Sequence, residues 1–302
     1  MTAKVILNPY AGRWKALKRL AEVETVLQEA HIEYELTITD SPGHGTSLAF
    51  QSVIKGFNPI ISAGGDGSIS EVVNGMMMAI KDNSEIQMPS LGILPLGSAN
   101  DLVINLELPT DLKEAAKVIA AGNVHLLDLG LVNERFFDNN SAVGLEPTIT
   151  LIQQDIKHLH GVLRYLLATL IGISQNPQWT MHLEWDGGEY NGPLTLVTVG
   201  NNPLTGGLFF MTPHADPFDG LLTFVYGYMP TRFEILRLLP RTMKRGKGSY
   251  IENPNIHEIN STWLRISSET PTPMHADGEI LSEAIQAVEY RVVPGCLPLL
   301  IK

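Results

Sequence analysis

The 302-residue sequence has one cysteine, no long apolar run and fewer cations than anions. Because Cys296 has no partner cysteine, an internal disulfide is excluded, and a reducing compartment is favoured over a secreted disulfide scaffold. The longest apolar run, residues 162–173, contains Arg164 and is too short to span a bilayer. No apolar leader with a small-residue cleavage site begins the chain. We therefore expect a cytoplasmic protein that is neither exported nor transmembrane.

Two enzyme classes are disfavoured by patterns that are missing. The nine histidines are scattered and one cysteine cannot build a zinc cluster, so nothing indicates a transition-metal site. No G-x-S-x-G motif occurs, so the nucleophile elbow of Ser-His-Asp hydrolases is absent from the sequence.

Cations are scarce and unevenly spread. The chain has 21 Lys and Arg against 32 Asp and Glu, a formal net charge of −11, and we therefore expect no nucleic-acid partner. Residues 231–247 are the exception, because a single acid there accompanies the basic residues Arg232, Arg237, Arg241, Lys244, Arg245 and Lys247. Apolar residues interleave with these cations, which predicts peripheral contact with the inner surface of an anionic membrane. The alternative is a sandwich-covering helix with a solvated basic face.

Strand and helix patterns alternate in the first part of the chain. The expected strands are residues 4–8, 35–39, 59–63 and 91–94, and the expected helices are residues 13–30, 46–55, 68–81 and 112–121. Strands separated by helices of this length imply a parallel sheet covered on both faces.

After residue 122 the pattern changes to short strands separated by Gly, Pro and Asn, which is typical of an antiparallel sandwich. The expected strands are residues 124–131, 135–139, 181–185, 194–200, 222–226, 263–267 and 287–292, with helices at 146–172 and 232–243. We expect one domain of residues 1–128, to which residues 293–302 return as a strand, and a second of residues 129–292.

Glycine-rich turns follow three of the expected strands, at residues 8–13, 64–68 and 94–101. Glycines let backbone N–H groups approach phosphate oxygens, and the start of a helix adds partial positive charge. Parallel sheets bind ligands at this edge, so the turns predict a polyphosphate site. Asp66 fits such a site only if it faces a metal ion, a metal-bound water or a ribose hydroxyl. The alternative is a tight strand-to-helix turn capped by Ser68.

These motifs resemble the diacylglycerol kinase catalytic family, especially its soluble bacterial lipid kinases. The resemblance rests on Asn8-Pro9 with Gly12, GGDGS at 64–68 followed by Glu71 and Asn74, LPLGSAND at 94–101, residues 216–221 and Asp277-Gly278-Glu279. It implies an α/β nucleotide-binding domain like those of NAD kinases and phosphofructokinases, and a C-terminal all-β sandwich that takes the lipid. It also implies transfer of the γ-phosphate of ATP to a lipid hydroxyl in the cleft between them, with Mg²⁺. Ser68 and Ser98 replace the threonines usual in the family, and each keeps the hydroxyl.

The resemblance also assigns site residues. The implied ATP contacts are Asn8, Pro9, Tyr10, Ala11, Gly12, Thr39, Gly64, Gly65, Asp66, Gly67, Ser68, Ile69, Ser70 and Ser98. For Thr39 the alternative is a strand end that needs no ligand. Glu279 is implied as the base that accepts the proton of the lipid hydroxyl, with Asp277 as its rival, whereas the isolated pattern reads as an exposed acidic turn.

The family's magnesium loop corresponds to oxygen atoms of Asp216 and Asp219 and the carbonyl of Leu221, and its alternative is a type I turn. A second Mg²⁺ is expected to arrive with ATP. Residues 162–173 line a cavity for acyl chains or form ordinary core. An enzyme of the NAD kinase or phosphofructokinase type with a soluble substrate stays open, as does a non-catalytic lipid-binding regulator. The lipid is not identified, and the sequence leaves a homodimer open.

Overall fold

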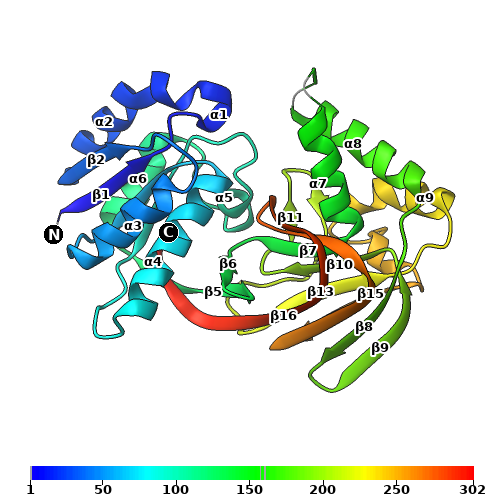
Figure 1. Ribbon diagram of the computed structural model, residues 1–302. Helices are drawn as coiled ribbons and strands as arrows, with labels where there is room; N and C mark the ends of the chain where they lie inside the picture. The colour runs from blue at the N-terminus through cyan, green and yellow to red at the C-terminus, as the bar shows by residue number, and fades with distance from the viewer. Residues whose placement is uncertain (1, 157, 160) are drawn as a thin grey trace. The chain divides into compact units, whose positions relative to one another are not determined.

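Figure 1 shows the computed structural model, which describes residues 2–156, 158–159 and 161–302. The contact pattern divides the chain into two compact units. The residues up to Leu129 form one unit together with Pro294–Lys302, and Gly130–Val293 form the other.

The N-terminal unit is an α/β unit. Its elements are β1 (Ala3–Leu7), α1 (Ala11–Trp14), a 3₁₀ turn (Ala16–Arg19), α2 (Leu20–Glu29), β2 (Tyr34–Ile38), α3 (His44–Ile54), β3 (Ile60–Gly64), α4 (Asp66–Asp82), β4 (Leu91–Pro95), α5 (Asp101–Asn105) and α6 (Leu112–Ala121). The strands β5 (Val124–Val132) and β16 (Glu279–Leu300) each contribute residues to both units.

A parallel sheet in the order β4, β3, β1, β2 carries this unit. All residues of β1, β3 and β4 are buried, as expected for parallel strands covered on both faces. Val5, Ala63 and Leu94 belong to a core shared with α2 and α6, while α3 and α4 contact β1 and β3. The end of β16 pairs in parallel with β4, with Leu299 opposite Leu91. The carboxyl ends of β1, β3 and β4 therefore lie at one edge of the sheet.

The helix expected over residues 13–30 is wrong as a single element. The backbone has positive φ angles at Gly12, Arg13 and Trp14, of 59°, 61° and 67°, and regular helix begins only at α2. The chain turns back at the end of β1, where Gly12 lies against the backbone of Leu96 in the turn after β4, and periodicity gives no sign of such a tertiary constraint. The short helix α5 was not expected at all.

The C-terminal unit combines antiparallel strands with helices. Its elements are β6 (Arg135–Phe137), β7 (Asn140–Gly144), α7 (Leu145–Asp155), α8 (Gly161–Gln175), β8 (Trp179–Trp185), β9 (Gly188–Leu194), β10 (Leu196–Gly200), β11 (Leu204–Thr205), β12 (Phe209–Phe210), β13 (Leu222–Gly227), α9 (Arg232–Thr242), a 3₁₀ turn (Tyr250–Glu252), β14 (Ile256–Ser261) and β15 (Trp263–Ala276). The helix expected over 146–172 is thus two helices, and the strand expected over 263–267 continues to Ala276.

Because side chains alternate along the strands, those on the two faces of the sheet belong to different cores. The antiparallel order is β14, β13, β10, β7, β15, and β15 also pairs with β8 of the β8/β9 hairpin. Val197 and Val199 of β10 and Phe224 of β13 belong to the core formed between strands. Leu196 and Val225 belong to a second core, formed with α7, α8 and α9, which cover the sheet on that side (Figure 1).

Two further features of the structure concern its helices and its single cysteine. Within the described ranges, no helix has both the length and the apolar character needed to cross a membrane. Cys296 is a free cysteine, and burial raises the pKa of its thiol to about 12, so the reactive thiolate is scarce at neutral pH.

Candidate active site

The three glycine-rich turns converge at the carboxyl edge of the parallel sheet. Asn8, at the end of β1, donates from Nδ2 to Oγ of Ser68 in α4 over 2.9 Å. Its Oδ1 accepts a hydrogen bond from the backbone N–H of Tyr10 over 3.0 Å. One side chain therefore organises its own turn and links it to the turn after β3.

Glycines permit the close approach of these turns. A Cβ on Gly97 would lie 2.5 Å from the Cα of Gly65, and a Cβ on Gly12 would lie 2.5 Å from the carbonyl oxygen of Leu96. A Cβ on Gly64 would lie 2.3 Å from Oγ of Ser68. Backbone therefore packs against backbone where Gly12 meets Leu96 and where Gly97 meets Gly65. Turns with accessible backbone N–H groups are the type expected at the polyphosphate site predicted from the sequence.

Gly97→Ala is expected to lower the free energy of unfolding by about 1–3 kcal/mol, because the new methyl group meets backbone that cannot rotate away. Gly67→Ala is the matched control, since a Cβ there meets no atom within 4 Å. Its effect should stay within about 0.5 kcal/mol. Urea denaturation of both variants measures the difference, and equal stability of the two would contradict the close approach.

Asp66 joins the turn after β3 to the start of α5. Its Oδ1 accepts the backbone N–H of Leu102 over 3.3 Å, and the N–H groups of Asp101 and Asn100 also contribute. Burial raises the pKa of Asp66 above its usual range, and these N–H groups oppose the rise without cancelling it. Helix N-terminal amides are thus a further partner for this carboxylate, beyond the metal or ribose expected from the sequence.

Asp66→Asn is expected to raise the unfolding temperature at neutral pH. A carboxyl group whose pKa is higher in the folded state than in the unfolded state loses its stabilising contribution as the pH rises through the folded pKa. Asparagine is neutral and keeps an oxygen to accept the Leu102 N–H. Thermal unfolding followed from neutral to mildly acidic pH should show the gain shrinking as Asp66 becomes protonated. A variant less stable throughout would mean that charge-assisted bonds to α5 outweigh the desolvation.

The other residues of the predicted nucleotide site differ in whether their side chains are buried or exposed. Thr39 is buried, and its N–H donates to the carbonyl of Leu7 over 2.9 Å, so it extends β2 beside the end of β1. Ser98 is exposed in the turn after β4. Ile69 and Ser70 are only 1% exposed, which leaves their side chains in the interior of the unit. Ile69 can therefore serve a ligand only through its backbone.

Glu71 has a role that the sequence did not indicate. Its carboxylate accepts the backbone N–H groups of Gly43 over 2.8 Å and Gly45 over 2.9 Å, at the start of α3. The Oγ of Thr46 donates to the backbone carbonyl of Glu71. Glu71 thus caps α3 from α4 and fixes the two helices together behind the turn after β3.

In the C-terminal unit, the turn between β15 and β16 carries both candidate catalytic carboxylates. The Asp277 carboxylate accepts the backbone N–H groups of Asn139, Asp138 and Asn140 over 3.0, 3.2 and 3.2 Å. The N–H of Asp277 in turn donates to the carbonyl of Asn140 over 2.8 Å. Asp277 therefore holds the start of β7 against the end of β15.

Glu279 has a different environment from Asp277. Its Oε2 lies 2.7 Å from a guanidinium nitrogen of Arg135 in β6, and its side chain is 47% exposed. The sequence analysis missed Arg135, because no local pattern links two residues that are 144 positions apart. Asp277 thus has its oxygens engaged by backbone amides, whereas Glu279 presents a half-exposed carboxylate beside one cation.

The loop of the predicted magnesium site is a set of Asx turns. Oδ1 of Asp216 accepts the N–H of Phe218 over 3.1 Å, and Oδ1 of Asp219 accepts the N–H of Leu221 over 2.9 Å. Both aspartates are exposed, and each has a second carboxylate oxygen. This donor set of hard oxygens fits Mg²⁺.

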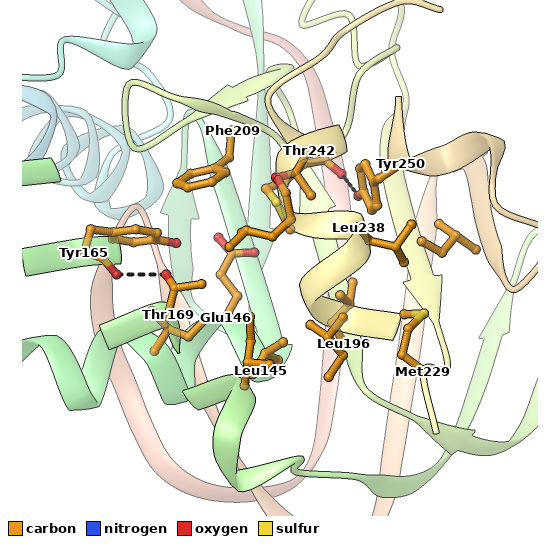
Figure 2. A pocket seen from close by; sticks show the side chains of 16 residues that line it. Leu145, Glu146, Tyr165, Thr169, Leu196, Phe209, Met229, Leu238, Thr242 and Tyr250 are labelled. Carbon is orange, nitrogen blue, oxygen red and sulfur yellow. Dashed lines mark hydrogen bonds between the residues drawn. The ribbon is translucent and has the colours of Figure 1, made fainter. Parts of the chain in front are cut away.

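An apolar pocket lies in the same unit as the carboxylate turn (Figure 2). It measures about 610 Å³ including its open mouth, with about 70 Å³ available to the centre of a water molecule. The helices α7, α8 and α9 and the strands beneath them supply its walls: Leu145, Glu146, Ile149, Tyr165, Thr169, Ile173, Leu196, Phe209, Met211, Met229, Ile235, Leu238, Leu239, Thr242, Tyr250 and Ile256. Among these lining residues, Glu146 alone has a carboxylate.

Comparison with known proteins bears on this arrangement. Residues 2–132 match the model of the diacylglycerol kinase catalytic domain, and residues 140–301 match that of the YegS C-terminal NAD kinase beta sandwich-like domain. Curated proteins named diacylglycerol kinase from Staphylococcus saprophyticus and Bacillus subtilis are each 28% identical over 92% of this chain, and the matches cover 88% and 89% of those proteins.

Solved structures show the same fold. The crystal structure of a diacylglycerol kinase from Bacillus anthracis aligns with a TM-score of 0.76 at 22% identity, over 100% of this chain and 97% of that one. Yeast NADH kinase complexed with NADH aligns with a TM-score of 0.54 at 13% identity, over 100% and 84% of the two chains.

The predicted fold class is confirmed: an NAD kinase-like α/β domain is followed by a β-sandwich domain. The curated relatives that match most of this chain are named as kinases. The chain belongs to the diacylglycerol kinase catalytic-domain family. The roles assigned to individual residues stay predictions.

Proposed function

We propose that the protein is an ATP- and Mg²⁺-dependent lipid kinase that transfers the γ-phosphate of ATP to a hydroxyl of a lipid such as diacylglycerol. The observation that carries this proposal is the apolar pocket of the C-terminal unit, which belongs to the same unit as the Asp277 and Glu279 turn. Apolar walls add little binding free energy for a sugar or a nucleotide, whereas a hydrocarbon chain gains about 0.8 kcal/mol of binding free energy for each buried methylene. The small inner space favours a flexible chain over a bulky head group.

In this proposal the turns after β1, β3 and β4 bind the phosphates of ATP through backbone N–H groups, with Asn8 and Ser68 keeping two of the turns in register. Bound Mg²⁺ supplies the counter-charge that phosphoryl transfer requires. Asp216, Asp219 and the carbonyl of Leu221 are the residues proposed to hold a second, structural Mg²⁺.

Glu279 is our choice for the proton acceptor. A base must keep an oxygen directed at the substrate hydroxyl, and the Asp277 oxygens already accept three backbone N–H groups. Glu279 is half-exposed, and its contact with Arg135 fixes the direction of the carboxylate. Arg135 acts here as a positioning residue for Glu279.

The lipid is proposed to enter from a membrane surface met by α8 and α9. The inner sides of these helices line the pocket through residues such as Thr169 and Leu238. Their outer sides expose large apolar residues: Leu163, Leu167, Leu170, Phe233 and Leu236. Exposed cations lie beside the outer side of α9 and in the segment after it: Arg232, Arg237, Lys244, Arg245 and Lys247. Apolar residues flanked by cations on an otherwise acidic protein suit an anionic bilayer.

Reversing two of these charges, with Arg237→Glu and Lys244→Glu together, is expected to weaken binding to phosphatidylglycerol vesicles by roughly 10- to 100-fold, at about 1 kcal/mol for each cation near the surface. The matched control reverses Lys55 and Lys81, which are exposed on the N-terminal unit and change the net charge equally. Vesicle cosedimentation measures both variants. Equal losses in the two would mean that net charge, and no particular surface, governs binding.

Transfer of label from γ-labelled ATP tests the function itself. Wild-type protein with Mg²⁺ should label diacylglycerol or another hydroxyl-bearing lipid in mixed micelles, and a chelator should abolish the labelling. Parallel reactions contain NAD or fructose 6-phosphate and no lipid. Label in either soluble acceptor alone would replace the lipid kinase with a soluble-substrate kinase. Absence of label in all acceptors would favour a lipid-binding regulator.

A further inference from the structure

A buried polar cluster connects the apolar pocket to the carboxylate turn. At its centre is Glu146 in the first turn of α7, whose side chain lines the pocket yet is only 6% exposed as a residue (Figure 2). Its Oε1 accepts from Nδ2 of Asn140 over 2.8 Å and lies 3.2 Å from Nε2 of His275. Its Oε2 accepts from Oγ1 of Thr198 over 2.8 Å.

The burial of the Glu146 carboxylate costs desolvation free energy, which suggests that this residue has a role other than packing. A carboxylate moved from water into an apolar wall costs several kcal/mol unless partners compensate it. Burial alone raises the pKa of Glu146, but the contacts from His275, Thr198 and Asn140 outweigh burial and hold it below the usual range, so the group stays ionised. An apolar side chain would fill this wall at lower cost, so the wall is not optimised for packing alone.

The partners of Glu146 lead directly to Asp277. Asn140 donates its backbone N–H to the Asp277 carboxylate over 3.2 Å and accepts the N–H of Asp277 over 2.8 Å. His275 precedes Asp277 by two residues on β15 and is 2% exposed, and its backbone carbonyl accepts a hydrogen bond from Oγ of Ser141. Asn140 on β7 is therefore hydrogen-bonded to the carboxylate turn, and His275 on β15 is close to the turn in sequence.

The pocket wall reaches Glu146 from the other side. Leu145 and Ile149 flank it on α7 and line the same pocket. A hydrocarbon chain that fills the pocket would therefore contact the first turn of α7, which carries Glu146. The Glu146 carboxylate in turn contacts Asn140 and His275. A continuous set of contacts runs from the pocket to the turn through a single side chain.

We propose that Glu146 is a positioning residue that couples filling of the apolar pocket to the placement of the turn carrying Asp277 and Glu279. This inference rests on the proposed function for its kinetic consequence, although the coupling itself is a property of the C-terminal unit. A lipid tail in the pocket would keep the turn with Asp277 and Glu279 in the position needed for phosphoryl transfer. A ligand without a tail would leave the position of this turn unrestrained.

The kinetic test compares two substitutions on α7. Glu146→Gln keeps the shape and removes the charge, and it is expected to lower kcat for the lipid by about 100-fold, the order expected from a misplaced reacting group. The KM for ATP should not change. Ile149→Val is the control, because it trims the same pocket wall without touching the polar cluster, and it should raise the KM for the lipid with little change in kcat. A Glu146→Gln enzyme that remains folded and keeps kcat within about twofold of wild type would overturn the proposal.

A second measurement compares wild-type protein with Glu146→Gln and needs no activity. A short-chain diacylglycerol is titrated into isotope-labelled protein, and NMR follows the methyl groups of Leu145 and Ile149 together with the amides of Asn140 and Asp277. Coupling predicts that the amides shift along with the methyl groups, and that in Glu146→Gln the methyl groups still shift while the amides do not. Methyl shifts without amide shifts in wild type would refute the coupling even in an active kinase. Amide shifts without phosphate transfer would instead support the coupling and count against the proposed function.

Discussion

Glu279→Gln is expected to lower kcat for phosphoryl transfer to a lipid by a factor of about 100 to 10,000, the range that a general base contributes. Glutamine has nearly the same shape and can still meet Arg135, but it cannot accept the proton of the hydroxyl. The KM for ATP should be unchanged, because the turns proposed to bind ATP belong to the other unit. Steady-state kinetics with γ-labelled ATP and diacylglycerol micelles measure both constants.

The stability of the Glu279→Gln protein provides the control. Its contact with Arg135 involves two partly exposed side chains, with exposures of 47% and 26%, and such ion pairs contribute about 0–1 kcal/mol. Urea denaturation should therefore detect little change. Nearly full activity in the folded variant would remove Glu279 from the role of base and return it to Asp277, the rival that the sequence analysis left open.

Asp277→Ala is expected to have the largest effect on folding, with a loss of about 2–5 kcal/mol in the free energy of unfolding. The substitution removes the acceptor of three backbone N–H groups in the segment 138–140 and leaves them without that partner. It also places alanine at a φ of 46°, which non-glycine residues other than Asn and Asp adopt at a cost. Thermal and urea unfolding measure the loss.

Asp277→Asn separates charge from conformation. Asparagine tolerates the positive φ and keeps one oxygen, so it should recover much of the stability lost in Asp277→Ala. Activity of a well-folded Asp277→Asn protein then decides whether the carboxylate charge itself matters for transfer. If Asp277→Ala unfolds like wild type, the hydrogen bonds to residues 138–140 do not support the turn.

The convergence of the glycine-rich turns was predictable because each part of the signal is local. The strands β1, β3 and β4 are apolar, and each is followed by a glycine-containing turn. Because helices separate them, they are expected to form a parallel sheet whose turns lie at one edge. The close approach of Gly65 and Gly97 is the structural form of that pattern. Periodicity failed at residues 13–19, where a constraint from the turn after β4 overrides helical spacing.

The polar contacts of the C-terminal unit were beyond sequence reasoning for a different reason. Arg135 meets Glu279 only after β6 has paired with β5, and Glu146 meets His275 only after β7 has paired with β15. A glutamate within an apolar helical stretch gives no sign of being buried, because its burial depends on partners supplied by other strands. The resemblance to a kinase family identified the acidic turn, but the distinction between Asp277 and Glu279 required their hydrogen-bond partners.

The long strand β16 has a consequence for how the protein is made. Its last part, within Pro294–Lys302, supplies a strand to the N-terminal parallel sheet, and it follows the whole of Gly130–Val293 in chain order. During synthesis on the ribosome, the edge of β4 must therefore wait for its partner until the entire C-terminal unit has been translated. The N-terminal unit cannot complete its sheet first, so an exposed strand edge accompanies translation and is a natural target for a chaperone.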